Sequence, residues 1–286
     1  PGFPGKLNLQ VVNGALSPVA SAPAAALDNV TSGGPYQNLG VPGAKSFHLG
    51  AAGYGNMAGL ATGQANPYYV RFATSGTSSV IGDAVAQAPT FFSLWIGNND
   101  VLSYATSGGS GVDQTGNTNP ATYGSNDITD PNVFASVISG YVNALTAGGA
   151  KGVMANIPNV TSIPFFTRVP YNPLTPALLG SNITALNTGL YGPLKQALTA
   201  FGAGDRINLL SATSANPLLI VDNSLTNLSA QLTLALTPSL GATTAAAFGQ
   251  IYGQARQATA EDLVLLSTSS VIGTTVTGAP ASINLN

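Results

Sequence analysis

The tetrapeptide Gly97-Asn98-Asn99-Asp100 carries the side chains in this chain that are best suited to chemistry. It directly follows the apolar run Thr90-Phe-Phe-Ser-Leu-Trp-Ile96. The Asn99 carboxamide offers N–H donors that can stabilise a developing oxyanion, and removal of one such donor typically lowers a rate by about 10²–10³. A structural interpretation stays open beside this one, in which Asn98 and Asn99 form a turn and Asp100 caps the next helix.

A second candidate is the segment Gly40-Val-Pro-Gly43-Ala-Lys45. Because glycine has no side chain, the backbone can approach a ligand closely there and point an N–H group at an anion. An ordinary tight turn has the same composition, so this alternative also stays open.

The only histidine, His48, follows Ser46 by two residues. Such a pair shares one face only in an extended segment, and a carboxylate would be needed to orient the imidazole ring. We therefore expect a structural or substrate-lining histidine rather than a catalytic base. Ser17 and Ser46 lack the turn expected around an exposed nucleophile, and Gly76-Thr-Ser-Ser-Val does not match a nucleophile elbow.

Three consecutive elements predict how these residues are positioned. Residues 90–96 read as a continuous apolar strand, which indicates burial on both faces as in a parallel sheet. A helix over 131–147 has Asp130 as its N-cap, Pro131 at its first position and apolar residues on one face. A strand over 152–157 follows. This βαβ order predicts an α/β sheet, whose ligands bind beyond the carboxyl ends of the strands, where the Asn99 segment lies.

The rest of the chain is predicted more coarsely. A strand over 7–12 should end at an Asn13-Gly14 turn, and the polar residues 105–128 read as a loop that is an insertion or a lid. The segments 184–201 and 224–256 are helix-like, and a last strand is expected over 261–267. Without an internal repeat or a sharp linker, the prediction is a single domain over residues 1–286.

Together, the two candidate segments resemble blocks of the SGNH (GDSL-type) hydrolases, which are serine esterases and lipases on a flavodoxin-like parallel sheet. Gly43 matches the block-two glycine, whose N–H helps to line the oxyanion hole, and Asn99 matches the block-three asparagine that completes it. The stretches "NLGVPGAKSFHL", "PTFFSLWIGNNDVLSYATSGG" and "GVMANIPNVTSIPFF" look like a Bacteroidota-type branch of secreted GDSL-like hydrolases. The similarity runs from about Gly14 to Gly278. The resemblance implies an α/β, flavodoxin-like three-layer fold with long loop insertions. It also implies candidates to line the substrate site, which are Ser46, His48, Gly97, Asn98 and Asp100.

Two blocks of that family have no counterpart in this sequence. No Gly-Asp/Asn-Ser-Leu motif lies between Pro1 and Leu39, and no Asp-x-x-His pair is present. We expect the first block upstream of Pro1 and the last downstream of Asn286, which makes this chain the middle of a longer protein. Two hypotheses follow. The chain is the oxyanion-hole portion of an ester hydrolase that acts on an acyl ester, lipid or acetylated glycan, or it is a non-catalytic surface subunit that keeps the hydrolase fold for binding.

Composition limits the partners. Only 6% of the residues are charged, against about 25% in an average domain. The 8 Lys and Arg residues are spread singly and supply no basic stripe for nucleic acid. The absence of Cys excludes disulfides and thiolate metal sites, the Asp113–Asp130 spacing fits no EF-hand, and we predict no cofactor. The apolar runs are too short for the about 20 residues of a membrane-spanning helix. The charge-poor surface favours a secreted or cell-surface protein, with a companion polypeptide or an outer-membrane complex as a partner.

Overall fold

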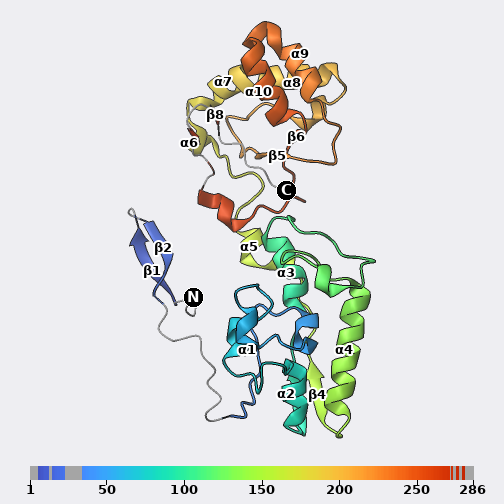
Figure 1. Ribbon diagram of the computed structural model, residues 1–286. Helices are drawn as coiled ribbons and strands as arrows, with labels where there is room; N and C mark the ends of the chain where they lie inside the picture. The colour runs from blue at the N-terminus through green and yellow to red at the C-terminus, as the bar shows by residue number, and fades with distance from the viewer. Residues whose placement is uncertain are drawn as a thin grey trace. The chain divides into compact units, whose positions relative to one another are not determined.

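The computed structural model describes residues 6–12, 15–22, 34–270, 272, 275–276 and 279–280 (Figure 1). The protein is a mixed α/β structure whose sheets are small and open, and one of them is a parallel pair. The chain divides into two compact units, and each is described here by itself. Unit 1 comprises residues 1–104 and 111–158, and unit 2 comprises residues 105–110 and 159–286. The expectation of a single domain therefore stays a prediction.

Unit 1 begins with an antiparallel hairpin of β1 (Leu7–Val12) and β2 (Ala15–Ala20), in the register that pairs Leu7 with Ala20. The predicted first strand is confirmed, whereas the predicted turn at residues 13–14 lies outside the described residues. In β1 the side chains of Leu7, Leu9 and Val11 alternate with polar ones, and all three are exposed. The hairpin therefore presents an apolar face to solvent.

The body of unit 1 is built around the parallel pair of β3 (Phe91–Leu94) and β4 (Lys151–Met154). These strands are joined through α3 (Asn98–Thr106) and α4 (Pro131–Thr146). The predicted βαβ order is thus confirmed. Asp130 caps α4 as predicted, because its carboxylate accepts the backbone N–H groups of Asn132 and Val133 at 2.8 and 2.9 Å.

The smaller elements of unit 1 complete its framework. They are α1 (Pro67–Val70), α2 (Val80–Ala86) and short 3-10 helices over Ser46–Gly50, Met57–Gly59 and Pro120–Thr122. A single apolar cluster joins β3, α2, α4 and the 3-10 helix that starts at Ser46. Helices therefore cover one face of β3.

The prediction that both faces of β3 are buried is wrong. Phe92 and Leu94 point into the cluster shared with α2 and α4. Phe91, by contrast, is 60% exposed, and Trp95, just after the strand, is 71% exposed. The reason is that, among the described residues of unit 1, β3 has one strand neighbour and the apolar cluster of α2 and α4 covers only the face that carries Phe92 and Leu94.

Unit 2 is mainly helical, and its apolar core lies among α7 (Asn182–Leu186), α8 (Gly192–Ala200), α9 (Ser229–Leu240) and α10 (Ala242–Tyr252). A π-helical turn over Asn187–Tyr191 links α7 to α8. Both helix-like predictions are confirmed in outline. The other elements are α5 (Pro164–Thr167), α6 (Pro176–Leu179), 3-10 helices over Val160–Ser162 and Gly204–Arg206, and the antiparallel pairs β5 (Leu219–Val221) with β6 (Ala255–Gln257) and β7 (Thr275–Val276) with β8 (Ala279–Pro280).

The strand predicted over residues 261–267 is wrong. Val264 makes a single antiparallel bridge to Val169, and a 3-10 helix over Leu266–Ser270 follows it. Asp262 accepts the Thr259 backbone N–H at 2.7 Å, and this local turn interrupts an extended conformation.

Across the described residues, no helix combines the length and apolarity needed to cross a membrane. This agrees with the short apolar runs in the sequence.

Candidate functional site

The two predicted oxyanion donors, Gly43 and Asn99, lie close together in unit 1. Asn99 Nδ2 donates a hydrogen bond of 2.9 Å to the backbone oxygen of Ala44, the residue that follows Gly43. A carboxamide carries two N–H donors, so one remains after this bond is made. Asn99 is only half-buried, which leaves that second donor room to meet a ligand.

Gly43 occupies the third position of a tight turn. Ala44 N–H donates to Val41 oxygen at 3.2 Å, Pro42 holds the second position, and Gly43 has a φ of +79°. Proline followed by a residue with positive φ is the signature of a type II turn, which explains why glycine is needed here. Gly43 is exposed, and within the described chain its N–H group has no hydrogen-bond partner. The turn thus leaves a backbone donor beside Asn99.

A buried carboxylate joins the turn to α3. Asp100 accepts the Ser46 backbone N–H at 2.8 Å and the Ser46 hydroxyl at 2.7 Å. Ser46 is 0% and Asp100 2% exposed. From α4, the Tyr141 hydroxyl donates to Ser46 oxygen at 2.9 Å. Ser46 and Asp100, which were both predicted to line the substrate site, thus bond to each other inside the protein. This arrangement suits a positioning role better than contact with substrate.

Lys45 extends the same polar cluster. Its side chain is buried, and Nζ donates to the backbone oxygen of Asp127 at 2.7 Å and more weakly to that of Gly124 at 3.5 Å. Burial lowers the pKa of the Lys45 ammonium, and the charges of Asp100 and Asp127 act in the opposite direction. The loop between α3 and α4 is thereby attached to the Gly43 turn.

The polar loop between α3 and α4, predicted to be an insertion or a lid, is anchored by Asp127 and Asp130. Asp127 accepts the backbone N–H groups of Val112 and Gly124 at 2.9 and 2.7 Å, and these bonds lower the pKa of its carboxyl. Asp130 accepts that of Gly116 at 2.7 Å in addition to its two capping bonds. Both carboxylates therefore hold the backbone of the loop in place. No cluster of metal-ligating side chains occurs in the described residues.

His48 has a structural position. Its Nδ1 accepts the Lys45 backbone N–H at 3.0 Å, and its ring stacks on Tyr54 with the centroids 4.7 Å apart. Burial, together with the positive charge of Lys45, lowers the pKa of His48 to about 4. The ring is therefore neutral near pH 7, and since Nδ1 is the acceptor, Nε2 carries the proton. A histidine in this state cannot take a proton from a nucleophile through either nitrogen.

Gly97 and Asn98 differ in what surrounds them. A Cβ on Gly97 would lie 2.8 Å from side-chain atoms of both Ile157 and Phe134, and φ is +114°, so only glycine fits at the end of β3. Asn98 is half-buried, and its Oδ1 is enclosed without a hydrogen-bond partner in the described part of the chain. Gly97 is thus required by packing, whereas Asn98 keeps an unused acceptor next to Asn99.

A pocket of about 460 Å³ begins just before the Gly43 turn. It is lined by Tyr36, Asn38, Gly40, Pro42, Tyr68, Arg71 and Phe72. The Asn66 side chain holds one wall, because its Nδ2 donates to Pro42 oxygen at 2.9 Å. This pocket was not predicted from the sequence, although two of its residues, Tyr68 and Phe72, lie in the aromatic run that follows Asn66.

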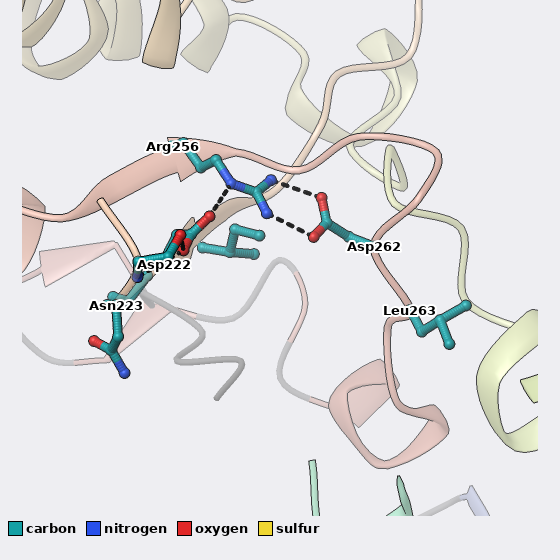
Figure 2. Close-up of a pocket in the computed structure, with 8 residues that line it drawn as sticks. Asp222, Asn223, Arg256, Asp262 and Leu263 are labelled. Atoms are coloured by element: carbon teal, nitrogen blue, oxygen red, sulfur yellow. Dashed lines mark hydrogen bonds and ion pairs between the residues drawn. The ribbon is translucent and has the colours of Figure 1, made fainter. Parts of the chain in front are cut away.

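Unit 2 contains a second pocket, of about 390 Å³, which was also not predicted from the sequence. Figure 2 shows the Arg256 guanidinium group between the carboxylates of Asp222 and Asp262. Arg256 Nε donates to Asp222 at 2.7 Å, and its two terminal nitrogens donate to Asp262 at 2.7 and 2.8 Å. Asp222 also accepts the Ser224 hydroxyl, and this bond and Arg256 lower its pKa to about 2. The polar wall of this pocket is therefore formed by the ion pairs of Arg256 with Asp222 and Asp262. These three residues, named the latch, connect β5, β6 and the turn at Asp262.

Comparison of this chain with family models, with curated proteins and with solved structures gives no match. The fold and the site together define a mixed α/β protein with two hydrogen-bond donors at the carboxyl end of a parallel strand.

Proposed function

We propose that this chain carries the oxyanion-binding part of a carboxylic ester hydrolase of the SGNH (GDSL) type, on a flavodoxin-like sheet. The observation that carries the proposal is the position of the Asn99 carboxamide, 2.9 Å from the backbone oxygen of Ala44. This contact brings the second N–H of Asn99 to the turn whose Gly43 N–H has no hydrogen-bond partner among the described residues.

The chemistry follows from these two donors. Attack on an ester carbonyl forms a tetrahedral intermediate, and its negatively charged oxygen is stabilised by donors that are already in place. Gly43 N–H and Asn99 Nδ2–H would supply the two hydrogen bonds. The buried bonds between Ser46 and Asp100 keep the turn and the start of α3 in register, so neither donor has to be reorganised during the reaction. The proposal assigns only these donors to the chain, because the nucleophile and base blocks of the family have no counterpart in its sequence.

The pocket that precedes the Gly43 turn supports an acyl ester as substrate. Its aromatic side chains Tyr36 and Phe72 contact each other edge to face, with ring centroids 6.5 Å apart. Such a surface accommodates an acyl chain or the apolar face of a sugar ring. A lipid or an acetylated glycan therefore fits the proposal, and both agree with a protein that is secreted or bound at a bacterial surface.

The test is the turnover of p-nitrophenyl acetate by the native assembly that contains this chain. Asn99→Ala should lower kcat by about 10²–10³, the usual effect of losing one oxyanion donor. Asn143→Ala, on an exposed position of α4, is the matched control and should leave kcat unchanged. Unchanged kcat in Asn99→Ala would refute the assigned role.

A second function, that of a non-catalytic surface subunit, is favoured by the apolar face of the β1–β2 hairpin. Leu7, Leu9 and Val11 are exposed together, and contiguous exposed apolar patches commonly mark interaction surfaces. The intact mass of the native material separates the two functions. A companion polypeptide or heavier precursor with the missing motifs favours the hydrolase, and a lone species of 28.6 kDa favours the subunit.

A further inference from the structure

The turn at Gly43 has two possible forms, which point its N–H group in opposite directions. Its four positions are Val41, Pro42, Gly43 and Ala44, closed by the bond of 3.2 Å from Ala44 N–H to Val41 oxygen. Type I and type II turns differ in the orientation of the central peptide, which here carries the Pro42 oxygen and the Gly43 N–H. Proline at the second position suits both types, and glycine adopts either sign of φ, so these four residues alone do not fix the form. The φ of +79° at Gly43 is that of type II.

Asn66 holds the central peptide of this turn in the type II orientation. Its Nδ2 donates to the Pro42 oxygen at 2.9 Å. In a planar trans peptide the oxygen and the N–H point to opposite sides. The bond that keeps the Pro42 oxygen towards Asn66 therefore directs the Gly43 N–H away from Asn66. A type I turn would take the Pro42 oxygen to the other side and break this bond.

The Asn66 side chain is itself fixed through both of its polar atoms. Oδ1 accepts the backbone N–H groups of Tyr68 and Tyr69 at 2.8 and 3.4 Å, and Nδ2 gives its second N–H to the Tyr54 hydroxyl at 3.1 Å. Asn66 is only 9% exposed. If the turn changed form, one donor of this buried amide would lose its acceptor, which is unfavourable because water has little access to it.

The carbonyl group on the other side of Gly43 is held as well. Asn99 Nδ2 donates to the Ala44 oxygen at 2.9 Å. Two asparagines from different elements thus bind the backbone oxygens before and after Gly43. They differ in what remains available, because Asn99 keeps a second N–H, whereas both N–H groups and both lone pairs of the Asn66 amide are used within the protein.

We propose that Asn66 is a positioning residue: its bond to the Pro42 oxygen selects the type II form of the turn and thereby fixes the direction of the Gly43 N–H. The consequence for catalysis rests on the proposed function, in which this N–H is an oxyanion donor. The same bond polarises the central peptide and makes its N–H a stronger donor. Asn66 acts only through this peptide and does not contact substrate.

Two variants remove the bond and keep the cap that Asn66 provides for α1. Asn66→Asp has nearly the same shape and replaces the donor by an acceptor. Asn66→Ser is uncharged, keeps a hydroxyl for the cap and is too short to reach Pro42, so it also serves if Asn66→Asp fails to fold. Asn56→Asp is the matched control. Asn56 caps the 3-10 helix over Met57–Gly59 and, among the described residues, makes no bond to the Gly43 turn.

The form of the turn is measured by NMR on the full chain, without a substrate. The Pro42 Hα lies close to the Gly43 amide proton in a type II turn and farther from it in type I, so the nuclear Overhauser effect between them reports the form. We expect a strong effect in the native chain and in Asn56→Asp. In both Asn66 variants it should be several-fold weaker.

The consequence for catalysis is measured as turnover of p-nitrophenyl acetate by the native assembly. Both Asn66 variants should lower kcat by about tenfold, the factor that one hydrogen bond can supply, and leave KM unchanged, because the Gly43 N–H acts on the transition state. Gly43→Ala favours a negative φ and should lower kcat in the same way. In the double variant with Asn66→Ser the effect should be well below the product of the two, since both act on one peptide.

The outcomes separate this inference from the proposed function. An unchanged Overhauser effect in folded Asn66 variants would overturn the inference, whatever the turnover. Independent effects that multiply in the double variant, or a rise in KM in place of a fall in kcat, would also overturn it, because Asn66 would then act by another route. A weaker Overhauser effect with unchanged kcat would support control of the turn by Asn66 and refute the Gly43 N–H as an oxyanion donor.

Discussion

The two units each hold a cluster of charged side chains, and the clusters differ in what they leave unbonded. In unit 2, all three guanidinium nitrogens of Arg256 donate to partners, and two carboxylates close the cluster. In unit 1, Asp100 and Lys45 bond to a hydroxyl and to backbone groups, and the Asn99 side chain makes one hydrogen bond to the part of the chain that the structure describes. The guanidinium donors of the Arg256 cluster bond to carboxylates of the same cluster, which therefore connects the segments that carry them. The Asp100 cluster keeps donors at its rim, which is what a binding site requires.

The largest expected effect comes from breaking the buried cluster of unit 1. Asp100→Ala leaves the Ser46 N–H and hydroxyl without their acceptor and removes one of the two negative charges, Asp100 and Asp127, that act on Lys45. The free energy of unfolding of unit 1 should fall by about 3 kcal/mol, as is typical when one member of a buried charged network is removed. Urea denaturation followed by Trp95 fluorescence measures it, and Ser46→Ala, which removes one bond, should cost about 1 kcal/mol. Equal losses in the two variants would contradict the central position of Asp100.

The latch of unit 2 should contribute less, because its side chains are 19–25% exposed. Arg256→Ala should lower the free energy of unfolding of unit 2 by about 1–2 kcal/mol. Arg256→Lys should recover little of it, because an ammonium cannot replace the planar guanidinium that spans two carboxylates. Hydrogen exchange of the β5 and β6 amides measures the effect locally. Full recovery by lysine would show that charge alone, and no fork geometry, holds the latch.

Acid should separate the two units by the pH at which each begins to lose stability. The folded pKa of His48, about 4, lies below the unfolded value of 6.5, so the unfolded chain binds the proton more readily and unit 1 loses stability as pH falls from 6.5 towards 4. In unit 2 the pKa of Asp222 is lowered to about 2, so its stabilisation is complete above about 4 and is lost between about 4 and 2.

Thermal unfolding between pH 7 and 3, followed for the two units by NMR, would measure this order. His48→Gln should remove most of the loss in unit 1 between pH 6.5 and 4 and leave unit 2 as it was. Simultaneous loss of both units near pH 5 would contradict the assignment.

The smallest effect is expected at the Gly43 turn. Nothing lies within 4 Å of a Cβ added there, so Gly43→Ala should lower the free energy of unfolding only because alanine disfavours the positive φ, by about 1 kcal/mol. Gly148→Ala is the matched control, with equal space and an ordinary φ, and should cost nothing measurable. A loss well above 1 kcal/mol would mean that the turn has less freedom than its open surroundings indicate.

Local features of this protein were predictable wherever short-range geometry decides them. Asp130 followed by Pro131 and a periodic apolar face predicted α4, and a tight turn at Pro42-Gly43 was one of the two interpretations left open for that segment. The exposure of one face of β3 could not be predicted in this way. An apolar run has the same sequence pattern whether or not other strands and helices pack around it. The strand expected after Glu261 was also wrong, since Asp262 binds Thr259 locally and ends the extended conformation.

The candidate site was predictable only in part. Asn99 and Gly43 were identified from residue type and resemblance, and the structure brings their segments within hydrogen-bond distance, although their role as oxyanion donors stays a prediction. The use of Ser46 and Asp100 as a buried pair, and the neutral state of His48, could not be read from spacing. Ser46 and Asp100 are 54 positions apart, and only packing determines which distant polar groups meet.

The sequence by itself determined the helix cap and the order of strand, helix and strand, because dihedral preferences and hydrophobic periodicity act over a few residues. Tertiary structure alone decided which charges are buried together, which donors stay free and which face of β3 is exposed. Those outcomes depend on desolvation and on contacts between residues far apart in the chain, which a local pattern does not encode.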